Sequence, residues 1–332
     1  MFRTGIIGMG GIGYHLANEV RAHSNGVIEA VVDVNTDNLS RASEEFDVDE
    51  SSLYTDEAAM YAEESLDVVI IATPPGFHFD QIREAFDRGL HVLCEKPVVV
   101  DVEEARQVAQ WVRDESNVLM AGYQRHLNPS FVAARRRWQD SDLEPTFITG
   151  SLTQDWRHHY DRGTNWRMDP EVGGGGHLFS VGTHVVESVL WLTGLTPVSV
   201  TAQMEFDDDD QRIDKRSAMT VTFDNGAIAA FGDSGIAPGT MEHIHLWDEE
   251  GGVYLEGEGW EPRELSLVDE DGQRTWPEVD DAATQTKFEA LVEAIETGSE
   301  PPATAEDALR VTALLEAAYE AARTGTTVDV TL

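Results

Sequence analysis

The chain has 332 residues, which is long enough for two domains and a large hydrophobic core. Its 62 acidic and 23 basic residues give a formal net charge of −39, so its surface repels nucleic-acid phosphates and anionic membranes, and we expect neither as a partner. The acids are spread along the chain, which favours a protein adapted to a salt-rich cytoplasm over an ordinary acidic one.

A glycine-rich turn lies between the first expected strand, Arg3 to Gly8, and the first expected helix, Ile12 to His23. Its spacing is Gly-x-Gly-x-x-Gly, in the strand–turn–helix context that makes this motif meaningful. The first glycine permits the tight turn, the second lets the backbone approach a pyrophosphate, and the third lets helix and strand pack closely. The pyrophosphate would lie at the helix N-terminus. The cofactor-binding residues expected here are Gly8, Gly10, Gly11, Ile12 and Gly13.

The second expected strand, Val27 to Val32, ends in Asp33, 20 residues beyond Gly13. A carboxylate at this place accepts hydrogen bonds from the adenosine ribose hydroxyls and repels a 2′-phosphate. The next arginine is Arg41, well inside the following helix. We therefore expect NAD as the cofactor, with NADP as the alternative. The competing interpretation is a glycine-rich turn in a doubly wound domain that binds no dinucleotide.

The alternation of strands and helices continues, and six strands with crossover helices would complete a Rossmann-type domain over residues 1–122. Further strands are expected at Asp67–Ala72, His91–Cys94 and Asn117–Tyr123, and helices are expected to begin at Thr36, Asp56, Phe77 and Val102. The loop at Thr73 and Pro74 should border the nicotinamide half of the cofactor. His78 is a further candidate there, although a packed histidine at a helix start is the simpler interpretation.

The strand His91–Cys94 is followed by Glu95, Lys96 and Pro97. Pro97 cannot donate to a strand ladder, and it keeps Lys96 extended. Charged groups at the carboxyl edge of an open α/β sheet are more consistent with a site than with the surface, so we expect Glu95 and Lys96 to border the cofactor. Lys96 is also one of only three lysines. The alternative is a strand-end ion pair between the two neighbours.

Cys94 is the only cysteine, so we expect no intramolecular disulfide and a packing role for its thiol. The N-terminus enters a strand without a charged-then-apolar leader. No apolar run approaches the ~18 residues that a membrane span needs. We expect a soluble, cytoplasmic protein. The histidine, cysteine and acidic residues show no metal-ligand spacing, and we expect no metal.

Residues 123–332 are expected to form an α+β substrate-binding and oligomerisation domain. Strand-like segments follow one another between residues 198 and 256 without crossover helices, with a hairpin turn at Asn225-Gly226. Amphipathic helices are expected at Thr284–Thr297 and Thr304–Arg323. The result would be a large, mostly antiparallel open sheet with one free face, which favours a homodimer or homotetramer.

A run of four glycines, residues 173–176, leads into a helix expected from Leu178 to Leu192. Ser180, His184 and Glu187 fall on one face of this helix, and an apolar stripe on the other face should pack against the core. A histidine near the start of a helix that approaches the ligand crevice is a candidate general base. The alternative is a histidine that is partly buried and satisfied by its neighbours.

Together these motifs resemble the glucose–fructose oxidoreductase, inositol dehydrogenase and MocA (Gfo/Idh/MocA) family. The resemblance is carried by the glycine triad, Glu-Lys-Pro, Trp-Arg-x-Asp-Pro at 166–170 and Gly-x-His-x-x-Glu at 182–187, and it covers nearly the whole chain. It implies an NAD(P)-dependent dehydrogenase or reductase acting on sugars, inositols or related polyols. It also implies that Lys96 and His184 line the reacting carbon.

Two places depart from the family pattern. Ser180 stands where the family has an aspartate, and serine keeps one hydrogen bond but loses the charge. Asp155, Asp169 or Glu187 could substitute for it. His126-Leu127 replaces the more common Arg-Phe. These departures favour an unusual substrate within the class.

The expected reaction is the reversible oxidation of a secondary alcohol or of a sugar's anomeric hydroxyl. His184 would take the hydroxyl proton, and Lys96 would stabilise the developing alkoxide. Flat aromatic faces and guanidinium groups suit polyols, although Trp166 and Arg167 could equally be packing residues. The expected substrate-binding residues are Lys96, Arg125, Trp156, Arg157, Tyr160, Trp166, Arg167, Ser180 and His184.

Two other functions remain open. A redox-neutral enzyme would oxidise and re-reduce its sugar on a tightly held NAD, as some related glycosidases do, and would release no NADH. A catalytically silent sensor of dinucleotide or sugar would bind a partner protein, and Ser180 keeps that possibility open. The joint presence of Lys96 and His184 argues for an enzyme.

Overall fold

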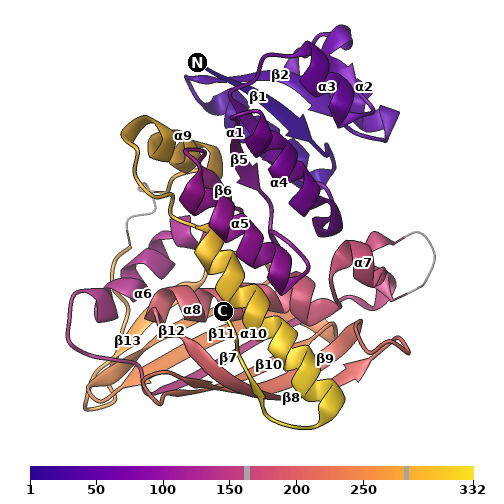
Figure 1. The fold of residues 1–332 in the computed structure, drawn as a ribbon. Helices are drawn as coiled ribbons and strands as arrows, with labels where there is room; N and C mark the ends of the chain where they lie inside the picture. The colour runs from indigo at the N-terminus through magenta and orange to yellow at the C-terminus, as the bar shows by residue number, and fades with distance from the viewer. Residues whose placement is uncertain (161–164, 280–283) are drawn as a thin grey trace. The chain divides into compact units, whose positions relative to one another are not determined.

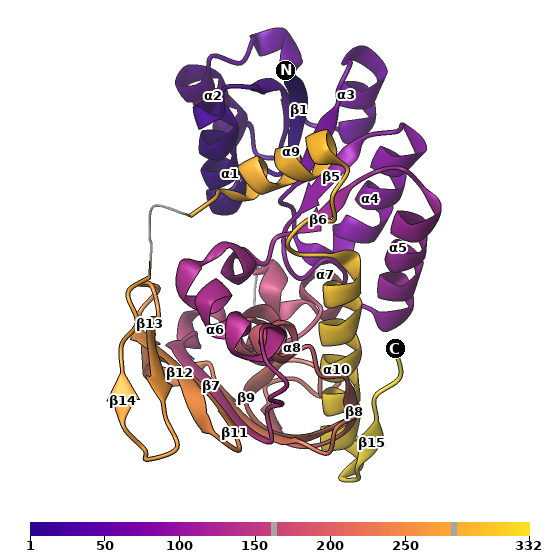
Figure 2. The same cartoon turned by 90° about the vertical axis from the view of Figure 1, so that its left-hand side faces the viewer.

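The computed structural model describes residues 1–160, 165–279 and 284–332, which fold into two compact units (Figures 1 and 2). Unit 1 comprises Met1–Val99, Glu103–Gln124 and Gln285–Ala305, and unit 2 comprises Val100–Val102, Arg125–Thr284 and Glu306–Leu332. The expected boundary after residue 122 lies two residues before Gln124. Residues 285–305, which the sequence analysis assigned to the second domain, belong to unit 1.

Unit 1 is built on a parallel sheet in the order β3-β2-β1-β4-β5-β6. Its strands are β1 (Phe2–Ile7), β2 (Gly26–Val32), β3 (Leu53–Tyr54), β4 (Val68–Ile71), β5 (His91–Cys94) and β6 (Leu119–Ala121). The four residues of β4 are all fully buried, as expected of a parallel strand covered on both faces. The Rossmann-type fold expected from the sequence is thus confirmed. The two-residue strand β3 is too short to leave a periodic pattern.

Helices flank this sheet on both faces (Figure 1). They are α1 (Gly11–Ala22), α2 (Thr36–Phe46), η1 (Glu50–Ser52), α3 (Glu57–Glu63), η2 (Pro75–Phe77), α4 (His78–Asp87), α5 (Val102–Asp114) and α9 (Lys287–Thr297). Asp56 caps α3 by accepting the N–H of Ala58 at 2.9 Å. The helix α2 begins at Thr36 as expected, and the side chain of Asn35 caps it by accepting the N–H of Asp37.

The helix α9 packs on unit 1 although it lies more than 160 residues beyond β6 in the sequence. Its Phe288 is fully buried, and its backbone N–H donates to Glu19 of α1 at 3.0 Å. Gly26 makes room for the ring, because a Cβ there would lie 2.9 Å from it. A helix that amphipathicity alone placed in the second domain thus belongs to the cofactor-binding unit.

Unit 2 contains a mixed sheet in the order β14-β13-β12-β11-β7-β10-β9-β8-β15. Its strands are β7 (Phe147–Asp155), β8 (Pro197–Phe206), β9 (Asp214–Phe223), β10 (Ile228–Ser234), β11 (Ile236–Asp248), β12 (Gly251–Glu258), β13 (Glu264–Val268), β14 (Arg274–Thr275) and β15 (Val328–Asp329). Only β7 and β10 pair in parallel among the described strands of this sheet, so the expected, mostly antiparallel sheet is confirmed.

Helices α6, α8 and α10 cover one face of this sheet (Figure 2). The helical elements of unit 2 are η3 (Gln124–Leu127), α6 (Pro129–Gln139), η4 (Arg157–His159), η5 (Trp166–Met168), α7 (Pro170–Gly173), η6 (Leu178–Gly182), α8 (Thr183–Thr193) and α10 (Ala305–Thr324). None of the helices in the described ranges is long and apolar enough to span a membrane.

The expected helix from Leu178 to Leu192 is divided in two. Residues 178–182 form a π-helical turn, and the α-helix α8 begins at Thr183. Ser180 therefore lies in the π turn and His184 in the first turn of α8. Every residue from Thr183 to Leu192 is buried, so the face of α8 that carries His184 and Glu187 is packed as well as the apolar stripe.

Candidate active site

The tight turn after β1 requires glycine at two positions. Gly8 has a φ of 90°, and a Cβ there would lie 2.8 Å from the backbone of Ala72 and Thr73. A Cβ on Gly13 would lie 1.9 Å from the carbonyl oxygen of Gly8. Only glycine therefore lets α1 begin this close to the end of β1.

The N-terminus of α1 faces open space. A Cβ at Gly10 or Gly11 would meet no atom within 4 Å, and the side chain of Ile12 is 52% exposed. The first N–H groups of a helix have no intrahelical partner, and the helix dipole favours anions there. The turn thus offers space and N–H donors to a pyrophosphate, and its residues fit a dinucleotide.

Asp33 is fixed at the end of β2 by three donors. The N–H groups of Met9 and Asn35 each lie 2.7 Å from its carboxylate, and the side-chain amide of Asn38 lies 3.0 Å away. The guanidinium of Arg41 donates to the carbonyl of Met9 at 3.1 Å. Arg41 therefore lies beside the glycine turn, closer to Asp33 than its place in the sequence suggested.

His78 connects two loops at the carboxyl edge of the sheet. Its ring nitrogens lie 2.8 Å from the carbonyl oxygen of Thr73, after β4, and 3.0 Å from that of Pro97, after β5. Burial lowers the pKa of His78, and the two carbonyl contacts oppose this shift. His78 is thus a buried support for the loop of Thr73 and Pro74. The simpler interpretation of this histidine as a packed residue agrees with these contacts.

The Glu-Lys-Pro turn follows β5 at the same edge as the glycine turn, because β1, β4 and β5 are neighbours in the parallel sheet. Glu95 is 8% exposed, and its carboxylate accepts the backbone N–H of Lys96 at 3.2 Å. Its other oxygen binds the ammonium of Lys287, from α9. A charged Lys287 at this place was not anticipated from the sequence.

In unit 2, His184 lies in the first turn of α8 and is 5% exposed. The ring of Trp260 lies edge-on to its imidazole, with 5.8 Å between the ring centroids. Arg125 donates to the carbonyl oxygen of His184 at 2.9 Å and also binds Ser188 and Glu242. These contacts favour a supporting role for Arg125, which the sequence analysis had placed at the substrate.

The three carboxylates that could replace the missing aspartate at Ser180 all have other partners. Asp155 forms an ion pair with Arg157 at 2.5 Å, and Asp169 caps α7. Glu187 binds the buried His126, whose ring stacks on Trp191 with 4.2 Å between centroids. The pairing with Glu187 also gives a structural reason for the unusual histidine at position 126.

The aromatic loop before the glycine run is described on both sides of residues 161–164, which lie outside the described ranges. Trp156 is 5% exposed, and Arg167 lies over its ring and over that of Trp166. Tyr160 donates to the carbonyl oxygen of Asp214 at 3.3 Å. Trp156 and Tyr160 are therefore packed into unit 2, whereas the exposed Arg157 pairs with its neighbour Asp155.

A buried polar cluster lies beneath this loop and was not identified from the sequence. A hydrogen bond of 2.7 Å joins Nδ1 of His177 to the carboxylate of Asp233 in β10, and the ring of His177 meets Trp156 edge-on. Asp214 of β9 accepts the hydroxyl of Tyr319 and the N–H of Leu178. Burial and the nearby Asp233 raise the pKa of Asp214 to about 6. The only sequence signal was the position of His177 directly after the glycine run.

The glycine turn and the charged turn after β5 lie at the carboxyl edge of a doubly wound sheet of the dinucleotide-binding type in unit 1, and unit 2 adds a separate C-terminal sheet domain. A model described as oxidoreductase family, NAD-binding Rossmann fold, matches residues 2–123, and a model of the GFO/IDH/MocA C-terminal domain matches residues 131–254. The chain belongs to the Gfo/Idh/MocA family of NAD(P)-dependent oxidoreductases.

Individual relatives agree with this assignment. A D-xylose 1-dehydrogenase (NADP(+)) of Haloferax volcanii is 28% identical over 98% of this chain and 99% of its own length. A 2,7-anhydro-N-acetylneuraminate hydratase of Escherichia coli is 27% identical over 60% of this chain and 52% of its own length. The solved structure of a levoglucosan dehydrogenase with NADH and levoglucosan has the same fold, with a TM-score of 0.87, 20% identity and 99% coverage of both chains.

Proposed function

We propose that this protein is a dehydrogenase or reductase that transfers a hydride between nicotinamide and a hydroxyl-bearing carbon of a sugar, inositol or related polyol. The observation that carries the proposal is the position of Lys96. It follows β5, at the carboxyl edge of the same parallel sheet that holds the glycine turn and Asp33. This edge is where ligands bind in doubly wound sheets.

The nicotinamide supplies the hydride acceptor, and the chain supplies the proton and charge chemistry. In the oxidative direction His184 takes the hydroxyl proton, and the ammonium of Lys96 stabilises the alkoxide as it forms. Proton transfer of this kind contributes about 10² to 10⁴ in rate, and stabilisation of the oxyanion contributes a similar factor. Arg125 donates to the carbonyl oxygen of His184, which holds the backbone at the start of α8 in place.

The cofactor is NAD rather than NADP in this proposal. The carboxylate of Asp33 is held rigidly by three donors, so it cannot turn away from a 2′-phosphate. A fixed negative charge there favours a free ribose hydroxyl. Arg41, beside the glycine turn, is the one feature that favours NADP, which the Haloferax relative's name specifies.

The test is NADH or NADPH production at high salt across a panel of aldoses, inositols and sugar acids. Turnover with one substrate class and NAD is the expected result. A silent panel from folded protein that still binds NADH, shown by quenching of tryptophan fluorescence, would overturn the dehydrogenase proposal.

A second candidate is a redox-neutral enzyme that oxidises and re-reduces its sugar on a retained NAD. Two observations favour it: Ser180 replaces the family's aspartate, and one relative is named a hydratase. Such an enzyme would convert its substrate, followed by NMR of the sugar, without accumulating NADH. Net NADH production in proportion to product would exclude it.

We also propose that the open face of the unit 2 sheet joins two copies of the chain. Despite the chain's excess of acids, a stretch of outward residues from β11 to β8 contains no carboxylate, although Glu256 of β12 and Glu205 of β8 lie on the same face at its two sides. The residues of this stretch are Phe147, Thr149, Ser151 and Thr153 of β7, Thr201 and Gln203 of β8, Ala218, Thr220 and Thr222 of β9, Ile228, Ala230 and Gly232 of β10, and Met241, His243 and His245 of β11.

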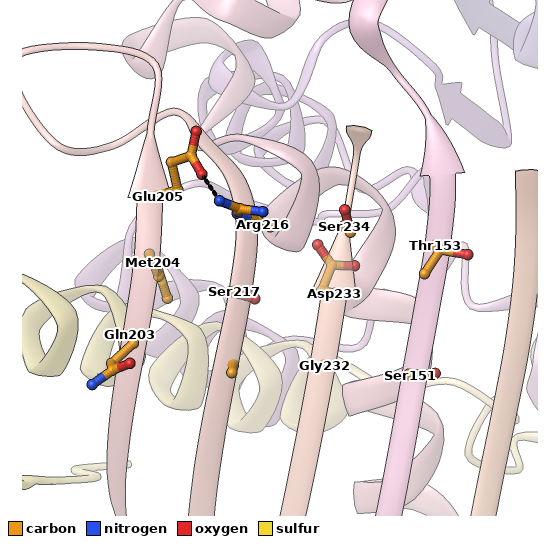
Figure 3. A pocket seen from close by; sticks show the side chains of 11 residues that line it. Ser151, Thr153, Gln203, Met204, Glu205, Arg216, Ser217, Gly232, Asp233 and Ser234 are labelled. Atoms are coloured by element: carbon orange, nitrogen blue, oxygen red, sulfur yellow. Dashed lines mark ion pairs between the residues drawn. The ribbon is translucent and has the colours of Figure 1, made fainter. Parts of the chain in front are cut away.

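Figure 3 shows part of this face. It holds a hollow of about 530 Å³, which Gly232 and the ion pair of Glu205 and Arg216, at 2.5 Å, help to line. An uncharged stretch of the face can meet its symmetry mate without desolvating acids. Thr220→Glu should convert the assembly to monomers in light scattering, whereas Gln139→Glu, at the exposed end of α6, should not. Unchanged mass for both variants would contradict this interface.

A further inference from the structure

Three observations make the lysine at position 287 unusual. The chain contains only three lysines, so this residue type is strongly depleted. Lys287 is the first residue of α9, where the helix dipole disfavours a cation. Its side chain is also only 9% exposed, although lysine is almost never buried without a partner. A residue that breaks local rules in this way is expected to have a compensating role.

That role begins with the carboxylate of Glu95. The ammonium of Lys287 binds Oε1 of Glu95, and the backbone N–H of Lys96 donates to Oε2 at 3.2 Å. Gly122 makes room for the carboxylate, since a Cβ there would lie 2.9 Å from Oε1. Each oxygen of Glu95 is therefore held by a different group, and the turn that carries Lys96 is fixed from beneath.

The backbone of Lys287 is fixed independently of Glu95. Thr286 and Glu289 form a reciprocal capping box, with hydrogen bonds of 3.1 and 2.8 Å. The next residue, Phe288, is fully buried, and its N–H donates to Glu19. Because α9 is anchored to α1 in this way, the lysine is presented to Glu95 by a rigid element.

The ion pair of Lys287 and Glu95 determines how much of the positive charge of Lys96 is offset by Glu95. Burial alone would raise the pKa of Glu95, but Lys287 and Lys96 offset this and hold it below its usual value. Glu95 is therefore a buried carboxylate that needs a cation. Lys96 is the other cation that acts on Glu95. Because a buried unpaired charge costs several kcal/mol, Glu95 would draw on the charge of Lys96 if Lys287 were removed.

We propose that Lys287 is a positioning residue for Lys96: it neutralises Glu95 and fixes the Glu-Lys-Pro turn, so that the charge of Lys96 acts on the substrate oxygen. The inference rests on the proposed function, because that function gives Lys96 its task. It extends the catalytic machinery to a helix that lies 190 residues farther along the chain.

The first experiment does not depend on activity. Reductive ¹³C-methylation labels the lysine side chains, and with only three lysines each NMR signal can be assigned and titrated. Lys287→Met should raise the pKa of Lys96 by about one unit or more, because Glu95 then acts on Lys96 alone. Glu95→Gln should shift it in the opposite direction. Lys215→Met, at the surface of unit 2, is the matched control and should leave Lys96 unchanged.

The second experiment uses kinetics. Lys287→Met should lower kcat at least about 10-fold with little change in KM for NAD, and its pH profile should move with the pKa of Lys96. Lys287→Arg should retain most activity. Glu95→Gln combined with Lys287→Met should recover part of the loss, because the pair is then neutral again.

The two arms separate the possible failures. If the unchanged protein turns over no substrate, the proposed function fails, while the titration of Lys96 still tests the role of Lys287. If Lys287→Met is folded and the pKa of Lys96 does not move, the positioning role is wrong. Should Lys287→Met not fold, two other variants decide it: Glu95→Gln should lower the pKa of Lys96, and Lys287→Arg, which keeps the cation on Glu95, should leave it close to that of the unchanged protein. No shift in Glu95→Gln would overturn the inference.

Discussion

At the scale of single residues, the site departs from its family mainly in where the negative charge lies. Ser180 carries none, and the three carboxylates that the sequence offered as substitutes are bound to Arg157, to the N-terminus of α7 and to His126. The acids near the helix start are instead Asp214 and Asp233, both buried behind His177. Under the proposed function, a substrate hydroxyl at Ser180 would meet a neutral hydrogen-bonding group.

The charge of Lys96 should matter for turnover far more than for cofactor binding. Lys96→Met is expected to lower kcat by about 10² to 10³, the usual cost of removing one group that stabilises a developing oxyanion. The Kd for NADH, measured by fluorescence, should change less than about threefold. Lys215→Met is the matched lysine control and should keep full activity. Equal losses in kcat and in NADH affinity would count against a role of Lys96 at the reacting centre.

Cofactor choice should depend on Asp33. Asp33→Asn keeps a hydrogen-bond acceptor for the N–H of Met9 but removes the charge that opposes a 2′-phosphate. We expect the ratio of kcat/KM for NADP to that for NAD to rise about 10-fold or more. Adding Arg41→Met should reverse part of this gain, since its guanidinium lies beside the same turn. An unchanged ratio in Asp33→Asn would show that the ribose is recognised elsewhere.

At the scale of elements, the sequence predicted those helices, strands and turns that are determined by interactions among residues close together in the chain. The glycine turn, the buried strands β4 and β5 and the cap at Asp56 follow from steric and hydrogen-bonding rules that act within a few residues. The π turn before α8 has no periodic signature, and β3 is only two residues long. The return of α9 to unit 1 depends on long-range packing of Phe288, which amphipathicity alone cannot indicate.

The same distinction applies to the candidate site. Lys96 and Asp33 could be predicted as site residues because a motif fixes their place relative to a strand end. The partners that hold the site together come from distant parts of the chain: Lys287 lies 192 residues from Glu95, and Glu242 lies 117 residues from Arg125. No periodicity connects such pairs, so only the folded chain reveals them.

The contact between β9 and α10 should make stability depend on pH. Burial and Asp233 raise the pKa of Asp214 to about 6, above the value of ~3.9 in an unfolded chain. Between these pH values the folded state binds more protons than the unfolded state, so this group's contribution to stability falls as pH rises, and it is fully present below about pH 4. The neighbouring Tyr319 donates its hydroxyl to the same carboxylate.

Asp214→Asn removes this titration while keeping an acceptor for the N–H of Leu178. The free energy of unfolding of the variant, relative to the unchanged protein, should therefore increase between pH 4 and 6, by at most about 3 kcal/mol for a shift of two pKa units. Urea unfolding at a series of pH values and constant salt measures this difference. A difference that stays constant with pH would show that Asp214 titrates normally in the folded state.

At the scale of the whole molecule, the charged residues are distributed unevenly over the surface. The net charge of −39 is carried by acids along the whole chain, while the stretch of outward residues on the open sheet face has none. The three lysines are similarly divided: Lys215 pairs with acids at the surface, and Lys96 and Lys287 serve one turn beside the cofactor edge. Lysine, the depleted basic residue, is thus retained beside the buried carboxylate of Glu95.

This distribution predicts a strong dependence on salt. Self-repulsion among the acids destabilises the compact state, and salt shortens its range from ~10 Å at 0.1 M to ~3 Å at 1 M. The urea midpoint of unfolding should therefore rise steeply between 0.1 and 1 M KCl and continue more slowly above that. Sucrose at matched osmolality is the control for general exclusion effects and should give a smaller rise. Equal stability at 0.1 and 1 M KCl would mean that the acids are balanced by structure rather than by counterions.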